Sequence, residues 1–240
     1  MRSLITLKAL TYSPTGGIVA APTTSLPEFI GGVRNWDYRF CWLRDATFTL
    51  YSLLNTGYRD EAQAWREWLL RAVAGDPAGL QIMYVLAGER RLWEHELPWL
   101  DGYAGSRPVR IGNAAHEQRQ TDVYGEVMDA FHLGRSYGIE SDDDTWRVQR
   151  ALVEFLEGNW QKPDSSLWEV RGPERRYTHS AVMAWVAVDR AVKGIEKFGL
   201  AGPLDRWRAL RSRIHADVCR HGFDHERNTF VQYYGGTAVD

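Results

Sequence analysis

The sequence predicts an all-α protein whose helices form two layers, as in an α/α toroid or solenoid. Seven segments have the hydrophobic periodicity of helices, and the strand–helix alternation of a parallel α/β sheet does not occur. Helices that are apolar almost all round alternate with amphipathic ones, as expected where an inner layer is covered by an outer one. Because there is no short internal sequence repeat, we expect a barrel rather than a regular repeat array.

The first predicted helix carries Leu4, Leu7 and Leu10 at helical spacing and ends at the turn cluster of residues 13–17. The second is apolar on nearly every side, which is typical of an inner helix, and Gly57 closes it. The third has one apolar face and one charged face, which predicts an outer position. The complete set of predicted helices is 3–12, 44–55, 60–74, 122–137, 143–158, 178–198 and 204–220.

Residues 75–120 are rich in turn residues and predict a long excursion between helices, with short strands at 81–84 and 108–111 and a helical turn within 92–100. The three aspartates at 142–144 favour a helix start over a calcium site, because an EF-hand spacing is missing. The helix at 178–198 is again nearly all apolar. The alternation in residues 228–234 predicts a strand.

Composition excludes several classes of partner. The net charge of −2 offers no basic surface for nucleic acid or an anionic membrane, which favours a neutral small-molecule substrate. No run of about 20 apolar residues predicts a membrane span, and the first residues do not have the apolar run of a signal peptide. Cys41 and Cys219 are far apart without metal-ligand spacing, so we expect buried thiols in a cytoplasmic protein.

Residues 33–45 interleave aromatic side chains with charged ones. Arg44 and Asp45 end this segment, and Trp36 and Trp42 lie within it. Such charges are hard to bury unless they pair with each other or contact a polar ligand. An ion-pair network at a helix N-terminus, with Asp45 stabilised by the helix dipole, is one interpretation. A polar-ligand site is the one we favour.

A second candidate site is the connection between the helices at 143–158 and 178–198. Glu169 follows Trp168 and precedes Arg171 by two positions. Apolar cover raises the pKa of a carboxyl group and a nearby cation lowers it, so Glu169 is a candidate for an acid with a tuned pKa. The alternative is a surface ion pair between Glu169 and Arg171 or Arg175.

Taken together, several motifs resemble glycoside hydrolase family 15, the family of glucoamylases, glucodextranases and bacterial trehalases. The resemblance runs from about residue 3 to residue 240 and implies a twelve-helix (α/α)6 barrel. The motifs are Gly-Ile-Val-Ala-Ala-Pro at 17–22, Asn-Trp-Asp-Tyr-Arg at 35–39, Cys-Trp-Leu-Arg-Asp at 41–45, Gln-Thr-Asp at 120–122 and Leu-Trp-Glu at 167–169.

The resemblance implies a role for each motif residue. Arg44 and Asp45 would hold hydroxyls of the terminal glucose, and Glu169 would be the general acid of an inverting reaction. Such an acid must be protonated, so the cover from Trp168 would have to outweigh Arg171. The further candidate substrate-binding residues are Trp36, Trp42, Trp168, Arg171, Gln120 and Asp122.

The chain departs from the family pattern in three ways. No segment resembles the motif of the general base, which inversion requires roughly 6.5–9.5 Å from the acid. The N-terminal β-sandwich domain of bacterial members is not recognisable, so residues 1–240 are expected to be a partial catalytic domain. About seven of twelve helices are present, which would leave the inner helices 44–55 and 178–198 with uncovered sides and promote self-association.

The sequence therefore predicts an inverting exo-α-glucosidase or trehalase that acts on a neutral oligosaccharide or disaccharide of glucose, with no cofactor and no metal. The motifs do not distinguish α-1,4, α-1,6 and α,α-1,1 bonds. One alternative is a carbohydrate-binding or assembly protein without hydrolysis. Another is an isomerase or lyase that uses His116, His179 or His221, although none of the three lies in a recognisable motif.

Overall fold

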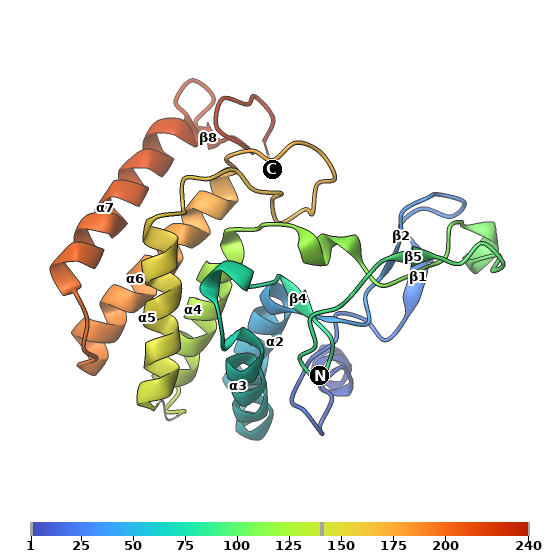
Figure 1. The fold of residues 1–240 in the computed structure, drawn as a ribbon, viewed down its shortest axis with the longest axis horizontal. Coiled ribbons are helices and arrows are strands. Elements are labelled where there is room, and N and C mark those ends of the chain that lie inside the picture. Colours follow the sequence, from blue (N-terminus) through green and yellow to red (C-terminus); the bar gives the residue numbers. More distant parts are fainter. Residues whose placement is uncertain (1, 140–141, 240) are drawn as a thin grey trace. The chain divides into compact units, whose positions relative to one another are not determined.

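A computed structural model describes residues 2–139 and 142–239, and it confirms all seven predicted helices with shifts of a few residues at their ends (Figure 1). The largest shift is in the first helix, which ends at Ala9 because Thr11 already pairs with Ile18. The helices are α1 Arg2–Ala9, α2 Leu43–Asn55, α3 Arg59–Val73, α4 Asp122–Ser136, α5 Asp143–Glu157, α6 Thr178–Phe198 and α7 Leu204–His221.

The chain divides into two compact units. The first contains residues 1–72 and 81–117, and the second contains residues 73–80 and 118–240. Within the part of the chain that the structure describes, no helix is both long enough and apolar enough to cross a membrane.

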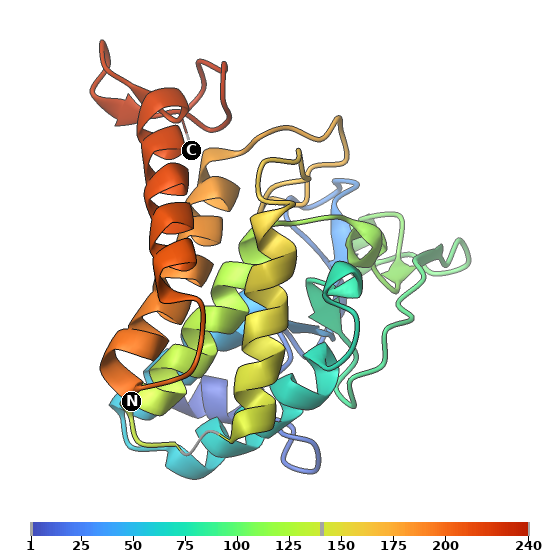
Figure 2. The same cartoon turned by 60° about the vertical axis from the view of Figure 1, so that its left-hand side comes forward.

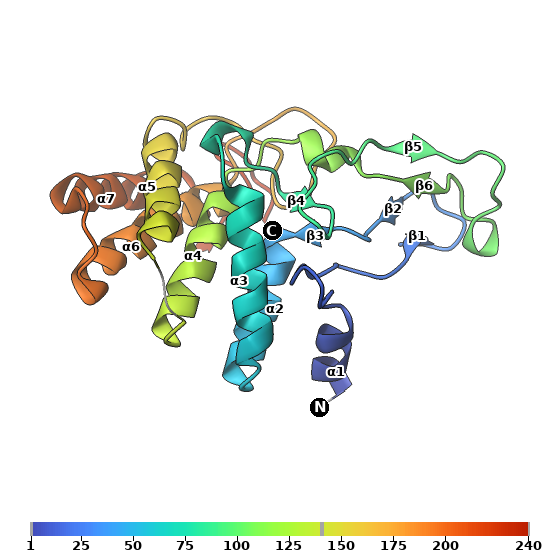
Figure 3. The same cartoon turned by 60° about the horizontal axis from the view of Figure 1, so that its bottom comes forward.

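The first unit contains three separate two-stranded antiparallel sheets in addition to its helices (Figure 3). Their pairs are β1 Thr24–Pro27 with β2 Asn35–Asp37, β3 Cys41–Trp42 with β4 Met83–Tyr84, and β5 His95–Glu96 with β6 Arg110–Ile111. The strands predicted within 81–84 and 108–111 are confirmed as β4 and β6. The helical turn predicted within 92–100 is wrong, because β5 lies there. The partner strand β6 is some fifteen residues away, so the periodicity of residues 92–100 alone could not indicate the pairing.

The core of the first unit is built by one face of α2 and by the aromatic residues of α3. Trp65 and Trp68 of α3 are fully buried, and Trp68 contacts the ring of Tyr84 in β4 edge to face. Phe48 and Tyr51 of α2 are exposed, so the apolar character of α2 extends beyond its buried face. Of the two cysteines predicted to be buried, Cys41 is buried and its pKa is raised to about 12 by desolvation.

The second unit is a layer of packed helices in which α4 lies along α6 and α6 along α7 (Figures 1 and 2). Gly125 of α4 allows a close approach, because a Cβ at this position would lie 2.3 Å from the carbonyl oxygen of Met183 in α6. The side of α6 that contacts its neighbours carries small residues, including Ala184, Ala187 and Ala191. Small side chains thus let these helices pack closely.

A cluster of charged residues around a buried aspartate joins α6 to α7, although α6 was predicted to be nearly all apolar. Asp189 of α6 is buried and forms ion pairs with Arg190, Lys193 and Arg211, at 2.6, 2.8 and 3.1 Å. Burial raises the pKa of Asp189, but the hydrogen bonds and charges of these cations outweigh it and hold the pKa below its ordinary value. The polar side of α6 is therefore an internal ion-pair site.

The end of the chain differs from the prediction in two ways. The strand predicted for 228–234 is confined to β8 Thr229–Phe230, which pairs with β7 Phe223–Asp224. Residues beyond β8 turn back, and the N–H of Tyr234 donates to the carbonyl of Arg176. Cys219 is exposed, not buried as predicted, because it lies on the outward side of the amphipathic α7.

Candidate active site

The first group of candidate residues lies at the N-terminus of α2. Strand β3 pairs with β4 and runs directly into α2, and the N–H of Leu43 donates to the carbonyl of Ile82. This fixes Arg44 and Asp45 in the first helical turn, where the helix dipole favours the Asp45 carboxylate. A 3.7 Å contact joins the two side chains, and the Asp45 side chain is about half exposed. A charged donor and a charged acceptor are thus presented side by side.

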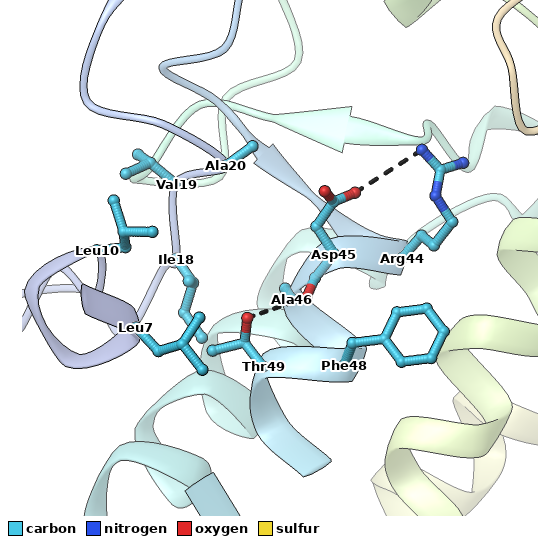
Figure 4. Close-up of a pocket in the computed structure, with 10 residues that line it drawn as sticks. All are labelled: Leu7, Leu10, Ile18, Val19, Ala20, Arg44, Asp45, Ala46, Phe48 and Thr49. Atoms are coloured by element: carbon cyan, nitrogen blue, oxygen red, sulfur yellow. Dashed lines mark hydrogen bonds and ion pairs between the residues drawn. The ribbon is translucent and has the colours of Figure 1, made fainter. Parts of the chain in front are cut away.

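Arg44 and Asp45 also line a cavity of about 280 Å³ in the first unit (Figure 4). The remaining wall is mostly apolar and comes from α1, from the segment after it and from α2: Leu7, Leu10, Ile18, Val19, Ala20, Ala46, Phe48 and Thr49. The hydroxyl of Thr49 donates to the backbone carbonyl of Asp45 and not to its carboxylate. The Asp45 carboxylate is the acidic group among the lining residues. An apolar cavity with a few polar groups is the usual form of a small-molecule site.

The motif at 17–22 forms one side of this cavity. The N–H of Val19 donates to Leu10, and those of Ala20 and Ala21 donate to the carbonyls of Phe40 and Tyr38. The segment thus lies along residues 38–40, which precede β3, and this brings the motif at 17–22 beside the motifs at 35–45.

The two candidate tryptophans of this unit are held by protein contacts. Trp42 is 3% exposed and packs against Tyr38 and Phe40, with ring centroids 5.7 and 6.3 Å apart. Trp36 donates from its indole nitrogen to Glu28, and the guanidinium of Arg110 lies 4.7 Å from its ring centroid. Trp42 is therefore part of the packed interior of this segment. One face of the Trp36 ring is covered by the guanidinium of Arg110.

The ion pair of residues 33–45 that contains a buried carboxylate lies at the end of β2 and not at the helix N-terminus, and the polar-ligand site stays a prediction. Asp37 is buried and accepts hydrogen bonds from the Arg39 guanidinium and from the N–H of Gly112, so it belongs to an internal ion-pair network. Arg44 and Asp45, by contrast, border the cavity. The segment thus combines a buried carboxylate that is paired with a partly exposed arginine and two charged residues that border a cavity.

The second group of candidate residues lies in the second unit, around the N-terminus of α4. Gln120 and Asp122 flank Thr121, the N-cap residue of α4, and both are buried. The amide nitrogen of Gln120 donates to the Oε1 of Gln118 at 3.1 Å. Glu126 lies one turn further along α4 and is also buried, so Asp122 and Glu126 share a helix face. Sequence analysis missed Glu126, although its spacing of four from Asp122 was visible.

Glu169 occupies a tight turn between α5 and α6. Its N–H donates to the carbonyl of Ser166, and the N–H of Val170 donates to Ser165, at 3.1 and 3.0 Å. The side-chain amide of Gln118 donates to the carbonyl of Glu169 at 3.2 Å and to that of Val170 at 3.3 Å. Glu169 is half-buried, and its backbone is in the left-handed region with φ of 54°.

The residues beside Glu169 are more open than the sequence led us to expect. Trp168 is 61% exposed, and Arg171 is exposed as well. The Trp168 side chain is therefore largely in contact with solvent, whereas Glu169 itself is half-buried.

Asp164 and Gln118 are the residues of this region that sequence analysis overlooked. Asp164 accepts hydrogen bonds from the N–H groups of Ser166 and Thr121, and Gln118 contacts the Glu169 carbonyl. An aspartate that precedes two serines is a typical Asx-turn sequence, which could have identified Asp164. No local signal marks the contact of Gln118 with the turn, because Glu169 and Val170 are about 50 residues away.

The three histidines of the alternative function are held in different ways. The Nδ1 of His116 lies 2.9 Å from the Asn113 carbonyl, and the Nδ1 of His221 lies 3.2 Å from Asp217. His179 lies in the first turn of α6. Among the described residues, no three histidine, cysteine or acidic side chains are grouped as metal ligands.

Comparison with known proteins finds trehalases and solved glycosidases that are similar to this chain. A trehalase of Mycobacterium tuberculosis is 45% identical over 242 residues, which cover 100% of this chain and 35% of the trehalase. A glycosidase variant solved in complex with glucose matches with a TM-score of 0.73 at 17% identity, over 100% of this chain and 60% of that one. A glucoamylase of Saccharomycopsis fibuligera matches with a TM-score of 0.61 at 16% identity, over 97% and 50%.

These matches confirm the predicted fold class, the part of an all-α (α/α)6 toroid that this chain spans. The chain spans 34% to 42% of the length of the trehalase relatives that it matches. The family model described as Glycosyl hydrolases family 15 matches residues 1–240. The motifs at 17–22, 35–45, 120–122 and 167–169 lie within this match, and the chain therefore belongs to glycosyl hydrolase family 15.

Proposed function

We propose that the protein hydrolyses the α,α-1,1 bond of trehalose with inversion, and that Glu169 is the general acid. The observation that carries this proposal is the 45% identity to a trehalase, which extends over the whole chain, including both groups of candidate residues. The membership of family 15 supports glycoside hydrolysis as the reaction class.

Glu169 has the chemistry and the setting of a proton donor. A glucose leaving group is a poor one, so the glycosidic oxygen must receive a proton as its bond to carbon breaks. The turn that carries Glu169 is fixed by backbone hydrogen bonds and by Gln118, so the carboxyl group does not depend on a freely moving loop for its position.

Arg44 and Asp45 have the chemistry of a sugar clamp. A carboxylate accepts hydrogen bonds from two neighbouring hydroxyl groups, and a guanidinium donates to hydroxyl oxygens. The cavity they line is near the small end of the roughly 300–1,000 Å³ range of small-molecule sites, which suits a single sugar ring.

The proposed reaction consumes one water and one trehalose and yields two glucose molecules. Water attacks one anomeric carbon from the face opposite the leaving oxygen, a second carboxylate removes its proton, and Glu169 protonates the departing oxygen. Inversion converts the attacked ring to β-glucose, whereas the departing ring leaves as α-glucose.

The central test is Glu169→Gln in the full-length protein that contains residues 1–240. Glutamine cannot donate the proton, so we expect kcat for trehalose to fall by about 10²–10⁴-fold. Glu174→Gln is the matched control, because Glu174 is an exposed glutamate on the same connection between α5 and α6. Substantial activity in Glu169→Gln would contradict the assignment.

The stereochemistry and the substrate are tested by following early turnover with proton NMR. Trehalose should give α- and β-glucose in equal amounts before mutarotation, whereas a retaining enzyme would give α-glucose alone. Maltose and isomaltose in parallel reactions identify the linkage. If trehalose binds in calorimetry and no glucose forms, the carbohydrate-binding alternative is correct.

A further inference from the structure

Asp164, just after α5, is a buried carboxylate that joins two separate segments of the second unit. It is 1% exposed. Its Oδ1 accepts a hydrogen bond from the N–H of Ser166 at 3.0 Å, and its Oδ2 accepts one from the N–H of Thr121 at 2.8 Å. Ser166 begins the turn that carries Glu169, and Thr121 is the N-cap residue of α4. One side chain thus fixes the turn to the helix.

The backbone of the same residue closes the base of the connection between α5 and α6. The backbone of Asp164 and that of Arg175 exchange two hydrogen bonds, both 2.9 Å long. The N–H of Ser165 donates to the carbonyl of Arg119, also at 2.9 Å. The segment between these anchors is therefore a short, closed loop, and Glu169 lies near its middle.

The turn needs such anchors because its backbone is strained. Ser166 and Glu169 have φ of 67° and 54°, in the left-handed region that residues other than glycine seldom adopt. Conformations of this kind persist where the surroundings hold them in place. The hydrogen bond from Ser166 N–H to Asp164 restrains the first of these two residues directly.

Gln118 restrains the second strained residue. Its side-chain nitrogen donates to the carbonyls of Glu169 and Val170, and its side-chain oxygen accepts from the amide of Gln120. Hydrogen bonds from Gln118, in the segment that leads into α4, therefore hold the peptide groups that follow Glu169. Asp164 and Gln118 act on the two ends of the turn.

We propose that Asp164 and Gln118 are positioning residues, which hold the strained turn so that the Glu169 carboxyl group is placed for proton transfer. This inference rests on the proposed role of Glu169 as the general acid. Neither residue has to contact the substrate, because both act through the backbone of the turn. A displacement of about 1 Å at a reacting group can cost about 10²-fold in rate, so loss of either anchor should lower the rate of proton transfer.

The test compares two substrates whose leaving groups differ in their need for a proton. Trehalose releases a sugar oxygen that must be protonated, whereas α-glucosyl fluoride releases fluoride with little help from an acid. For Asp164→Asn we expect kcat for trehalose to fall about 10- to 100-fold, with KM changed by less than about threefold. The rate with α-glucosyl fluoride should change by less than about threefold.

The substitution Asp164→Asn keeps the size of the side chain and replaces one acceptor oxygen by a donor nitrogen, so one of the two N–H partners loses its acceptor. Gln118→Ala provides a second route, because Gln118 is partly exposed and its removal leaves no large cavity. We expect it to reduce trehalose hydrolysis selectively as well. The matched control is Asp142→Asn, since Asp142 accepts from the N–H of Thr145 at the start of α5, away from the turn.

The outcomes separate this inference from the function on which it rests. Equal losses with both substrates in Asp164→Asn and Gln118→Ala would show a general structural role and overturn the inference. Wild-type rates in both variants, with Glu169→Gln inactive on trehalose, would also overturn it and leave the role of Glu169 intact. Activity in Glu169→Gln would instead contradict the proposed function itself.

Discussion

Two carboxylates of this protein, those of Asp37 and Asp164, are buried and accept hydrogen bonds from the backbone, whereas that of Asp45 borders a cavity. Asp37 and Asp164 are almost inaccessible, and each accepts hydrogen bonds from backbone N–H groups. Burying a charge without partners is costly, so these positions require the contacts that they make. Asp45, by contrast, is half exposed at the edge of a cavity.

At the residue scale, Asp45→Asn should weaken the recognition of trehalose. A hydrogen bond to a charged group contributes about 1.5–3 kcal/mol, so we expect kcat/KM to fall about 10- to 100-fold. Steady-state kinetics of the full-length protein measure this. Asp60→Asn is the matched control, because Asp60 is an exposed aspartate in the first turn of α3 and the substitution changes the same helix-dipole contact. Equal effects of the two substitutions would refute a role in sugar binding.

At the scale of elements, the packing of α4 on α6 decides how the second unit is built. The two helices are in close contact where Gly125 faces the backbone of Met183. A side chain at this point meets main-chain atoms, which cannot move aside as the end of a flexible side chain can. The position of α4, which begins beside Thr121, thus depends on the absence of a side chain at Gly125.

We expect Gly125→Ala to destabilise the protein by about 1–3 kcal/mol, because it forces α4 and α6 apart. Denaturant unfolding measures the change. Gly158→Ala is the control: Gly158 lies at the C-terminal end of α5 with open space around it and an ordinary backbone conformation, so its substitution should cost little. If the two variants are equally stable, the close contact does not limit the packing of α4 on α6.

At the scale of the whole molecule, stability depends on pH through a histidine in a cationic setting. Burial lowers the pKa of His132 to about 4, helped by the charges of Arg190, Arg135 and Lys193 and opposed by that of Asp129. A lowered pKa means that the folded protein favours the neutral ring. Between pH 6.5 and about 4 the unfolded chain binds a proton that the folded chain does not, so stability falls as the pH falls through this range.

We therefore expect the midpoint of thermal unfolding to fall on acidification from pH 6.5 towards 4, and His132→Gln to remove part of that fall. Scanning calorimetry across this range provides the measurement. His95→Gln serves as the control, because His95 is exposed on β5. An unchanged pH dependence in His132→Gln would show that other groups cause the acid sensitivity.

The sequence by itself determined the helices and the segments that carry the candidate chemistry. Each helix has its periodicity and its end signals within a single stretch of 8 to 21 residues, so local pattern was enough. The motifs around Arg44, Asp45 and Glu169 were equally local. Membership of the family followed from their order along the chain, which the match over residues 1–240 bears out.

Tertiary structure decided everything that depends on partners distant in the sequence. The pairing of β5 with β6, the ion pair of Asp189 with Arg211 on the next helix, and the exposure of Cys219 all depend on which segment lies opposite. The anchors of the Glu169 turn are of the same kind, because Asp164 contacts Thr121 and Gln118 contacts Glu169 across more than 40 residues. A hydrogen bond between such residues has no local signature, since its energy appears only when folding brings donor and acceptor together.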